Sequence, residues 1–269
     1  MIPLEKIATV IQARMSSSRL PYKVMLSLAG KPLLLRLCER VNASLLKGSI
    51  IVATSTEPSD DPIENLCKNE GIKCYRGSLT DLLKRHLEAA ESVSADYVIK
   101  IPSDVPLIDP DVINRVITKF FRNGVDYDFV SNLHPATYPD GNDVEVMTIE
   151  ALKKADREAK RDFEREHTTP YFWENPQLFR IGNVTWETGF DYSMTHRWTI
   201  DYEEDYLFIK TVYDELWSPD KHFSLIDILN LLNRKPAIAA INSKYAGVNW
   251  YRHHLGDLRT VKNEQTKIL

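Results

Sequence analysis

Cysteine is scarce in this chain, and that scarcity bears on where the protein works. The 269 residues include three cysteines, Cys38, Cys67 and Cys74. No two of them form a Cys-x-x-Cys pair, and an odd number cannot all pair within one chain. A disulfide framework is therefore not expected, and reduced thiols favour a cytoplasmic protein.

Several kinds of partner are disfavoured by features that the sequence does not have. It contains no apolar run near the roughly 20 residues of a membrane-spanning helix, so no membrane partner is expected. Residues 1–6 lack the basic and apolar regions of a secretory leader, which again favours a cytoplasmic location. The formal net charge is −4 and the pI is near 6.0, so no basic excess indicates nucleic acid as a partner.

The chain also lacks the two common glycine-rich phosphate motifs. Neither Gly-x-x-x-x-Gly-Lys nor Gly-x-Gly-x-x-Gly occurs, which argues against P-loop ATPases and dinucleotide-dependent dehydrogenases. What is present instead is a polar loop at residues 11–23, directly behind an apolar strand predicted for residues 6–12. The end of a buried strand is where open α/β folds hold phosphates.

The composition of this loop suits a polyphosphate. Arg14, Arg19 and Lys23 offer charge-assisted hydrogen bonds, and the hydroxyls of residues 16–18 add neutral donors. Pro21 fixes the backbone between two of the cations, which a loop that is merely solvated does not need. A solvated basic loop is the alternative, because exposed Lys and Arg are common. One concentrated basic loop in an acidic protein favours a small anionic ligand.

Short apolar segments alternate with segments of helical periodicity along the first 122 residues. Strands are predicted at residues 6–12, 49–53, 72–75 and 97–101, and helices at residues 32–43, 62–69, 79–92 and 110–122. Three of these helices begin with proline, which the first helical turn tolerates. The alternation predicts an α/β fold with a mainly parallel sheet covered by helices on both faces.

The pattern is less regular after residue 122. We expect strands at 129–132, 144–148 and 197–201, and helices at 149–161, 164–173, 203–216 and 225–232. Residues 133–143 are expected to form a long loop over the carboxyl edge of the sheet, where binding residues tend to lie. One domain is predicted for residues 1–217, with a C-terminal helical extension, 218–269, packed on it. Trp217, Phe223 and residues 225–232 form either core or the surface of a homodimer.

Two aspartates each follow a predicted strand. Asp104 comes after residues 97–101, and Asp201 ends the run at residues 197–201. Carboxylates from two strand ends that converge near a basic loop make an oxygen site suited to Mg²⁺. Either aspartate can instead cap a helix or stabilise a loop.

Six further motifs follow the basic loop in a fixed order and carry a family resemblance. They are Ala53-Thr54-Ser55, Arg76-Gly77-Ser78, Asp104-x-Pro106-Leu107-Ile108-Asp109-Pro110, Tyr138-Pro139-Asp140-Gly141, Arg165-Glu166-His167-x-Thr169-Pro170 and Thr199-Ile200-Asp201. With Ala13-Arg14-x-x-Ser17-x-Arg19-Leu20-Pro21-x-Lys23, they resemble the sugar-activating cytidylyltransferases, the group of acylneuraminate and ketodeoxyoctulosonate cytidylyltransferases. The branch called spore-coat polysaccharide biosynthesis proteins is the most similar. The resemblance spans residues 6 to about 215 and implies a three-layer, Rossmann-like nucleotide-diphospho-sugar transferase fold.

The resemblance also implies an activity and a set of site residues. The activity is a magnesium-dependent transfer of CMP from CTP to an acidic or phosphorylated sugar-like acceptor, with release of pyrophosphate, in the synthesis of a surface polysaccharide or glycoconjugate. Catalytic roles fall to Arg14, Lys23, Asp104 and Asp201, and the two aspartates hold Mg²⁺. The implied nucleotide contacts are Gln12, Ala13, Arg14, Ser17, Ser18, Arg19, Lys23, Thr54, Arg76, Gly77, Lys100 and Ser103. The implied acceptor contacts are Asn132, Tyr138, Asp140, Asp143, Glu145, Glu166 and His167, a set rich in acceptors for sugar hydroxyls.

Three departures and two alternative functions accompany this interpretation. Ser16, Tyr22 and Ser103 stand where relatives commonly have glycine, which lets a backbone approach a ligand closely. His167 can also be a structural hydrogen-bonding group. The first alternative function is a glycosyltransferase, or a nucleotidyltransferase that uses UTP or GTP, on the same fold. The second is a non-catalytic nucleotide-binding relative.

Overall fold

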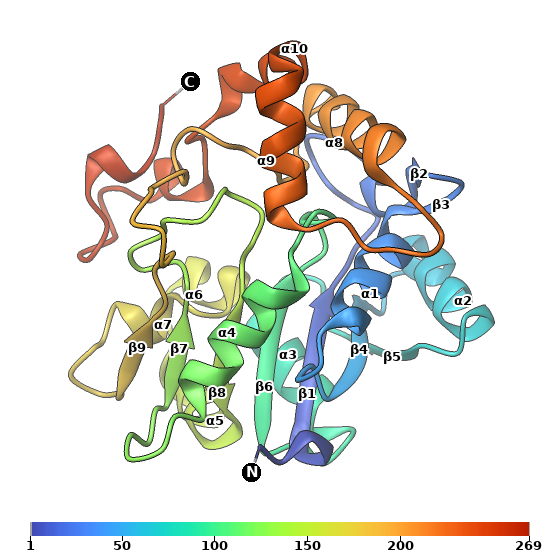
Figure 1. Ribbon diagram of the computed structural model, residues 1–269. Helices are drawn as coiled ribbons and strands as arrows, with labels where there is room; N and C mark the ends of the chain where they lie inside the picture. Colours follow the sequence, from blue (N-terminus) through green and yellow to red (C-terminus); the bar gives the residue numbers. More distant parts are fainter. Residues whose placement is uncertain (1, 269) are drawn as a thin grey trace.

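Seven strands form one mixed sheet in the computed structural model, which describes residues 2–268 (Figure 1). The strands are β1 (Ile7–Gln12), β4 (Ser49–Ser55), β5 (Lys73–Gly77), β6 (Tyr97–Pro102), β7 (Phe129–Ser131), β8 (Glu145–Thr148) and β9 (Ile181–Asn183), with β2 (Ser27–Leu28) and β3 (Lys31–Pro32) in a separate ribbon. The helices are α1 (Leu33–Ala43), α2 (Asp61–Asn69), α3 (Leu82–Glu91), α4 (Pro110–Phe120), α5 (Ile149–Glu158), α6 (Asp162–His167), α7 (Pro170–Trp173), α8 (Glu203–Leu216), α9 (Leu225–Arg234) and α10 (Pro236–Ala240).

The sheet is mainly parallel, with the strand order β5-β4-β1-β6-β8-β7-β9. β1 pairs in parallel with β4 and with β6, and β4 pairs in parallel with β5. β8 is antiparallel to both of its neighbours, while β7 and β9 are parallel to each other. The predicted α/β fold with a mainly parallel sheet is confirmed.

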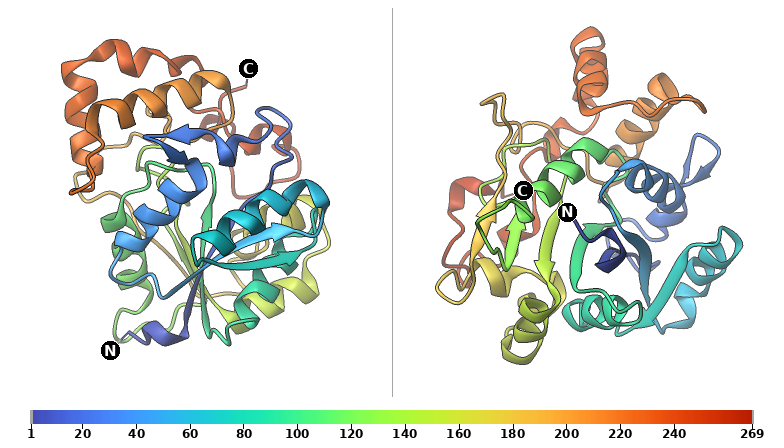
Figure 2. Two further views of the ribbon diagram at one scale, coloured as in Figure 1. Left: turned by 90° about the vertical axis from the view of Figure 1, so that its right-hand side faces the viewer. Right: turned by 60° about the horizontal axis from the view of Figure 1, so that its bottom comes forward.

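Helices cover both faces of this sheet, as the two views of Figure 2 show. Ile7 and Ile11 of β1 belong to a buried cluster with residues of α1, α2 and α4. The alternate residues Ala8 and Val10 belong to a second cluster with residues of α3 and α5. Successive strand residues face opposite sides of a sheet, so strands that are apolar throughout require a cover on each side.

Local sequence explains where several helices begin. Asp109 caps α4, because its Oδ1 accepts a hydrogen bond of 2.8 Å from the Asp111 amide. Pro110 takes the first helical position, where its missing N–H costs no hydrogen bond. Helices α1 to α4 overlap the four predicted ones, and α8 has the predicted bounds.

Cys38 on α1 and Cys67 on α2 are buried, and all three cysteines are free thiols.

Two elements predicted after residue 160 are wrong. The helix expected at 164–173 is divided into α6 and α7, because Thr168 between them has a φ of +72° and proline begins a new turn at position 170. Residues 197–201, all described by the structure, form no strand beyond one bridge between Asp140 and Arg197. Their backbone instead connects two loops, since the Ile200 amide donates to the Asp104 carbonyl at 2.9 Å.

Other differences are smaller. The helix expected at 149–161 ends at residue 158. β9 and the β2–β3 ribbon have no predicted counterpart, because strands of two or three residues are too short to show a period.

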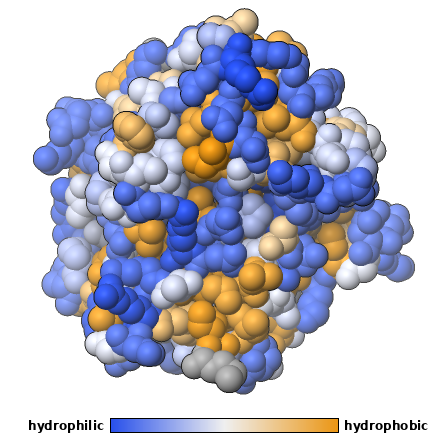
Figure 3. Space-filling view, viewed as in Figure 1, coloured by the Kyte–Doolittle hydropathy of each residue, from blue (hydrophilic) through white to orange (hydrophobic). Residues whose placement is uncertain are grey.

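The chain beyond residue 217 lies above the carboxyl ends of the strands (Figure 1). Phe223, Leu225 and Ile228 are buried in the same cluster as residues of α1 and α4, so the apolar face of α9 is core. Trp217 is 40% exposed. Hydrophilic residues cover most of the face in Figure 3, and hydrophobic residues gather near its lower centre. Among residues 2–268, no helix is both long and apolar enough to cross a membrane.

Candidate active site

The carboxyl ends of β1 and β6 open into a cleft of about 440 Å³. The strand order reverses between these two strands, because β4 and β5 follow on one side of β1 and β6 lies on the other. Ligands of open α/β sheets bind outside the strand ends at such a point. The basic loop after β1 and part of the loop at 133–143 line the cleft, as expected for binding loops.

Lys23 joins the two aspartates that follow predicted strands in the sequence. Its Nζ donates to Asp104 Oδ2 at 2.9 Å and to Asp201 Oδ1 at 3.2 Å. A third bond, of 2.6 Å, goes to the Ile200 carbonyl oxygen. Burial alone would lower the pKa of Lys23, but the two carboxylates outweigh it and raise the pKa above its ordinary value. Lys23 is therefore a cation that links segments 81 and 178 residues away.

Asp201 is held by three cations. Besides Lys23, Arg19 Nη2 lies 2.6 Å from its Oδ1 and Arg197 Nη2 lies 3.0 Å from its Oδ2. Burial would raise the pKa of Asp201, but the charges of Lys23 and Arg19 outweigh it and hold the pKa well below its usual range. Asp201 is thus an anion at any physiological pH.

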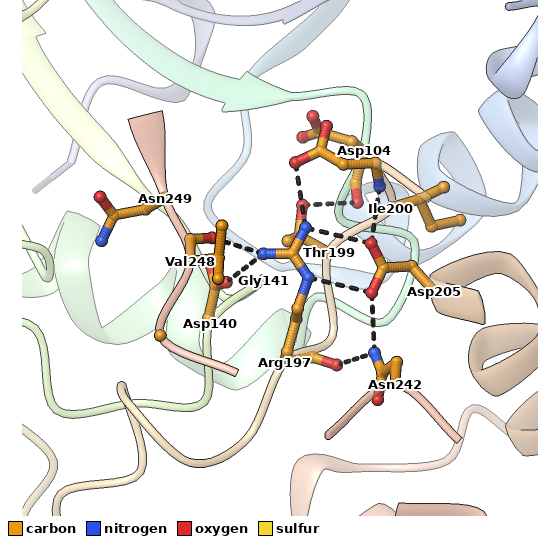
Figure 4. Close-up of polar contacts among 12 residues, drawn as sticks. Asp104, Asp140, Gly141, Arg197, Thr199, Ile200, Asp205, Asn242, Val248 and Asn249 are labelled. Carbon is orange, nitrogen blue, oxygen red and sulfur yellow. Dashed lines mark hydrogen bonds and ion pairs between the residues drawn. The ribbon is translucent and has the colours of Figure 1, made fainter. Parts of the chain in front are cut away.

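Arg197, which pairs with Asp201, belongs to a buried network with Asp205 and Asn242 (Figure 4). The Arg197 side chain is 1% exposed, and its guanidinium donates to both oxygens of Asp205 at 2.9 and 3.0 Å. Another bond of 2.6 Å goes to the Val248 carbonyl oxygen, and Asn242 Nδ2 donates to Asp205 at 2.9 Å. The network ties the C-terminal segment to the centre of the cleft.

Asp60 anchors the start of the basic loop. This carboxylate is fully buried, and its Oδ1 accepts a bond of 2.7 Å from the Met15 amide. Its Oδ2 accepts from the amide and the hydroxyl of Ser55, the last residue of β4. The Ala53-Thr54-Ser55 motif therefore contributes to loop position through Ser55.

Asp60→Ala is expected to lower the free energy of unfolding by about 2–4 kcal/mol, because hydrogen bonds to a buried charge contribute about 1.5–3 kcal/mol. Urea unfolding measures the loss. The neighbouring Asp61, which pairs with Arg76 at the surface, is the matched control, and Asp61→Ala is expected to cost less than about 1 kcal/mol. Equal effects of the two substitutions would contradict the anchoring role.

The loop accommodates a residue that replaces glycine. Tyr22 has a φ of +62°, the left-handed conformation that glycine adopts most readily. Tyr22 is 60% exposed and does not line the cleft. Ser103, in contrast, lines the cleft beside Asp104.

Four more carboxylates line the cleft, Asp140, Asp143, Glu145 and Glu166. Glu145 on β8 is 2% exposed and pairs with Lys100 on β6. Burial, together with the neighbouring Asp104 charge, raises the pKa of Asp143 to about 6. Burial and the charge of Asp143 raise the pKa of Asp140 well above its usual range. Asp140 and Asp143 therefore retain protons more readily than ordinary carboxylates do.

Asp143→Asn is expected to stabilise the protein above pH 7 by up to about 3 kcal/mol, because each pKa unit corresponds to about 1.4 kcal/mol. The folded-state pKa of Asp143 exceeds the unfolded value, so protonated Asp143 stabilises the folded protein at low pH. That contribution is lost as the pH rises from about 4 through about 6. Unfolding free energies measured from pH 4.5 to 8 test the expectation.

The control for this pH series is Asp128. Burial alone would raise the pKa of this carboxyl, but hydrogen bonds from Arg180 outweigh burial and lower the pKa. Asp128→Asn should therefore not remove the loss of stability between pH 4 and 6. An Asp143→Asn protein with the pH slope of the unmodified chain would refute the assignment.

A C-terminal segment, residues 248–254, forms a wall of the cleft. The ring of Trp250 stacks on His167 of α6 with centroids 3.8 Å apart. Burial, together with the charge of nearby Lys100, lowers the pKa of His167 to about 3, so this imidazole is neutral. His134 similarly stacks on Trp173 of α7 at 4.4 Å. Residues 248–254 were not predicted to line the cleft, because only their run of aromatic and basic side chains distinguishes them from an ordinary tail.

Most of the residues singled out from the sequence line this one cleft. They are Gln12, Ala13, Arg14, Ser17, Ser18, Arg19, Lys23, Lys100, Ser103, Asp104, Asp140, Asp143, Glu145, Glu166, His167 and Asp201. Asn132 and Tyr138 line a neighbouring cavity of about 310 Å³, which shares Asp140 and Asp143 with the cleft.

The structure does not bring Thr54, Arg76 and Gly77 to the cleft. Thr54 is fully buried within β4. Arg76 Nη1 donates to Asp61 and Glu64 of α2 at 2.6 and 2.7 Å. Carboxylates on the neighbouring helix thus engage a guanidinium that the motif assigned to the nucleotide.

The donor set at the centre of the cleft fits a metal that arrives with a phosphate ligand. Within residues 2–268, no three His, Cys, Asp or Glu side chains are grouped as a metal cage. Asp104 and Asp201 present two carboxylates on either side of one ammonium group. Mg²⁺ commonly takes one or two carboxylates and completes its shell with water and substrate phosphates.

The fold and the cleft place the protein in the class of nucleotidyltransferases. The chain belongs to the cytidylyltransferase family, whose model matches residues 8–226. An uncharacterized protein of Methanocaldococcus jannaschii is 36% identical, over 88% of this chain and 95% of the relative. The spore coat polysaccharide biosynthesis protein SpsF of Bacillus subtilis is 33% identical, over 88% and 98%. The structure of a cytidylyltransferase from Leptospira borgpetersenii is 32% identical, with a TM-score of 0.81 over 87% of this chain and 96% of that one. The resemblance stated from the motifs is confirmed.

Proposed function

We propose that this protein is a magnesium-dependent cytidylyltransferase that transfers CMP from CTP to an acidic or phosphorylated sugar-like acceptor and releases pyrophosphate. We further propose that it works in the cytoplasm, in the synthesis of a surface polysaccharide or glycoconjugate. The observation that carries the proposal is the contact of Lys23 with both Asp104 and Asp201, beside Arg19. The family, and the relation to the spore coat polysaccharide biosynthesis protein SpsF, support the biosynthetic setting.

Positioning and charge neutralisation account for most of this chemistry. An acceptor oxygen attacks the α-phosphorus while the bond to the bridging oxygen of pyrophosphate breaks. Asp104 and Asp201 would hold Mg²⁺, which would neutralise charge on the phosphate oxygens. Lys23 and Arg19 then exchange carboxylate partners for phosphate oxygens, which accept equally strong hydrogen bonds. We assign the acceptance of the hydroxyl proton to the pair of Asp140 and Asp143, whose carboxyls retain protons readily.

Thermal unfolding with each nucleoside triphosphate and MgCl₂ tests the nucleotide. CTP is expected to stabilise the protein more than UTP, GTP or ATP, because a ligand that binds only the folded state raises its melting temperature. Preference for UTP or GTP would replace the proposed nucleotide, and preference for a nucleoside diphosphate sugar would favour a glycosyltransferase.

Pyrophosphate release tests the reaction itself. CTP and MgCl₂ are incubated with a panel of ulosonic acids and sugar phosphates, and acceptor-dependent pyrophosphate is expected with at least one of them. CTP binding without release across the whole panel would favour a non-catalytic nucleotide-binding protein.

A further inference from the structure

Arg85 is a buried cation of the cleft that the sequence motifs do not include. It lies on α3, is 1% exposed and lines the cleft. Its Nη1 donates to the Ser78 carbonyl oxygen at 2.9 Å, while its buried Nε has no hydrogen-bond partner among residues 2–268. A buried charge is costly unless it is paired.

Two carboxylates near Arg85, Glu88 and Asp60, are engaged elsewhere. Glu88, one turn further along α3, accepts a bond of 3.0 Å from the Tyr75 hydroxyl. Asp60 accepts its bonds from Met15 and Ser55. Throughout the described chain, no ion pair involves Arg85. The guanidinium therefore lacks an anionic partner of its own.

Arg14, the second cation of this part of the cleft, has no ion pair within residues 2–268 either. Burial, together with the positive charge of Arg14, lowers the pKa of Arg85 to about 10. Two like charges that face one cleft repel each other. An anion bound between them would remove that repulsion and complete their hydrogen bonds.

The rest of the protein provides two contrasts. Arg19 and Lys23 lie in the same cleft but are already neutralised by Asp104 and Asp201. Arg40 on α1 is as buried as Arg85, at 2% exposed, but does not line the cleft. Arg40 donates through Nε and Nη2 to the carbonyls of Ile108 and Leu107. Among these four cations, only Arg85 is an arginine that is both buried and part of the cleft lining.

We propose that Arg85, together with Arg14, forms an anion-binding subsite for phosphate or carboxylate oxygens. The inference rests on the proposed function, which supplies two sources of such oxygens. They are the terminal phosphates of the nucleotide, which leave as pyrophosphate, and the acidic group of the acceptor. The terminal phosphates are the expected occupant, because Arg14 belongs to the same loop as Arg19 and Lys23.

Calorimetric titration of the full chain in metal-free buffer tests the subsite. The probes are inorganic pyrophosphate for the nucleotide source and ketodeoxyoctulosonate for an acidic acceptor. Arg85→Met is expected to weaken pyrophosphate binding by about 10- to 100-fold, as expected for losing charge-assisted hydrogen bonds. Arg85→Lys keeps the charge but loses the guanidinium fork. Its pyrophosphate affinity should therefore lie between those of the unmodified chain and Arg85→Met. Arg40→Met is the control for the loss of a buried arginine, and its pyrophosphate affinity should match that of the unmodified chain.

Stability gives a second readout that a merely structural arginine would not share. The melting temperature of ligand-free Arg85→Met is expected to be no lower than that of the unmodified chain, because the substitution removes an unpaired buried charge. Arg40→Met should melt at a lower temperature, because it leaves two carbonyls without donors.

Each outcome decides the proposal. Loss of pyrophosphate affinity in Arg85→Met alone supports the nucleotide source, and loss of ketodeoxyoctulosonate affinity alone supports the acceptor source. Unchanged affinity for both probes in a folded Arg85→Met protein overturns the subsite, as does the absence of binding to either probe by the unmodified chain. If CTP binds normally while the Arg85 variants bind pyrophosphate like the unmodified chain, the proposed function survives and this inference fails. If pyrophosphate binding depends on Arg85 but CTP is not preferred, this inference survives and the proposed function fails.

Discussion

Asp104→Asn and Asp201→Asn are each expected to reduce magnesium-dependent turnover of CTP by about 10²–10³-fold, the usual cost of removing one group that stabilises transition-state charge. Each substitution keeps the size of the side chain but removes the negative charge that a phosphate-bound Mg²⁺ requires. Initial rates of pyrophosphate release across a range of MgCl₂ concentrations give the measurement. Asp227→Asn, which changes a cap of α9 away from the cleft, is the control and should retain normal turnover.

The two variants should differ in stability. Asp104 contacts only Lys23 among the cations and its side chain is 28% exposed, so Asp104→Asn should cost less than about 1 kcal/mol. Asp201 neutralises Lys23, Arg19 and Arg197. Asp201→Asn should cost more than Asp104→Asn, because Lys23 and Arg197 each lose one of their carboxylate partners and Arg19 loses its ion pair. The depressed pKa of Asp201 means that its stabilisation is present above pH 4 and is lost only in strong acid. Turnover within a few fold of normal in either variant would exclude that aspartate as an essential ligand.

Lys23→Met is expected to lower the free energy of unfolding by about 3–5 kcal/mol without metal, because two carboxylates lose the cation between them. Millimolar MgCl₂ should restore much of this loss, since the freed carboxylates then bind the metal. The same variant should bind CTP much more weakly, with a smaller effect on CMP, if Lys23 contacts the terminal phosphates. Urea unfolding with and without MgCl₂, and titration with both nucleotides, measure these effects.

Lys31→Met provides the control for this second experiment. Lys31 pairs with Glu39 at the surface, where its side chain is 48% exposed, so the change should cost less than about 1 kcal/mol and respond little to MgCl₂. Arg19→Ala should weaken CTP binding less than Lys23→Met does, because the Arg19 side chain is 40% exposed. If the binding of CTP and of CMP weakens equally in the Lys23 variant, the proposed contact of Lys23 with the terminal phosphates is wrong.

Elements whose signals are local could be predicted from the sequence. α4 begins at Pro110 because Asp109 caps it, and both residues stand next to the helix they start. The four parallel strands that bring Gln12 and Asp104 to the cleft each show an apolar run long enough to recognise. Short or interrupted elements could not be predicted, as the division of α6 from α7 at Thr168 shows.

The motifs identified residues but not their partners. Arg76 and Arg85 lie close in sequence, yet Arg76 is bound by Asp61 and Glu64 of α2 whereas Arg85 faces the cleft. Nothing in the local sequence distinguishes these two arginines. The packing of α2 and α3 on opposite faces of the sheet decides which of them meets a ligand.

The sequence by itself determined the α/β class, the basic loop after the first strand and the family, because strand and helix periods and motif order are properties of neighbouring residues. Only the tertiary structure decided that Lys23 lies between Asp104 and Asp201, that Arg197 and Asp205 support Asp201, and that residues 248–254 wall the cleft. These contacts join segments separated by tens to hundreds of residues, and such contacts depend on how the whole chain packs around both faces of the sheet.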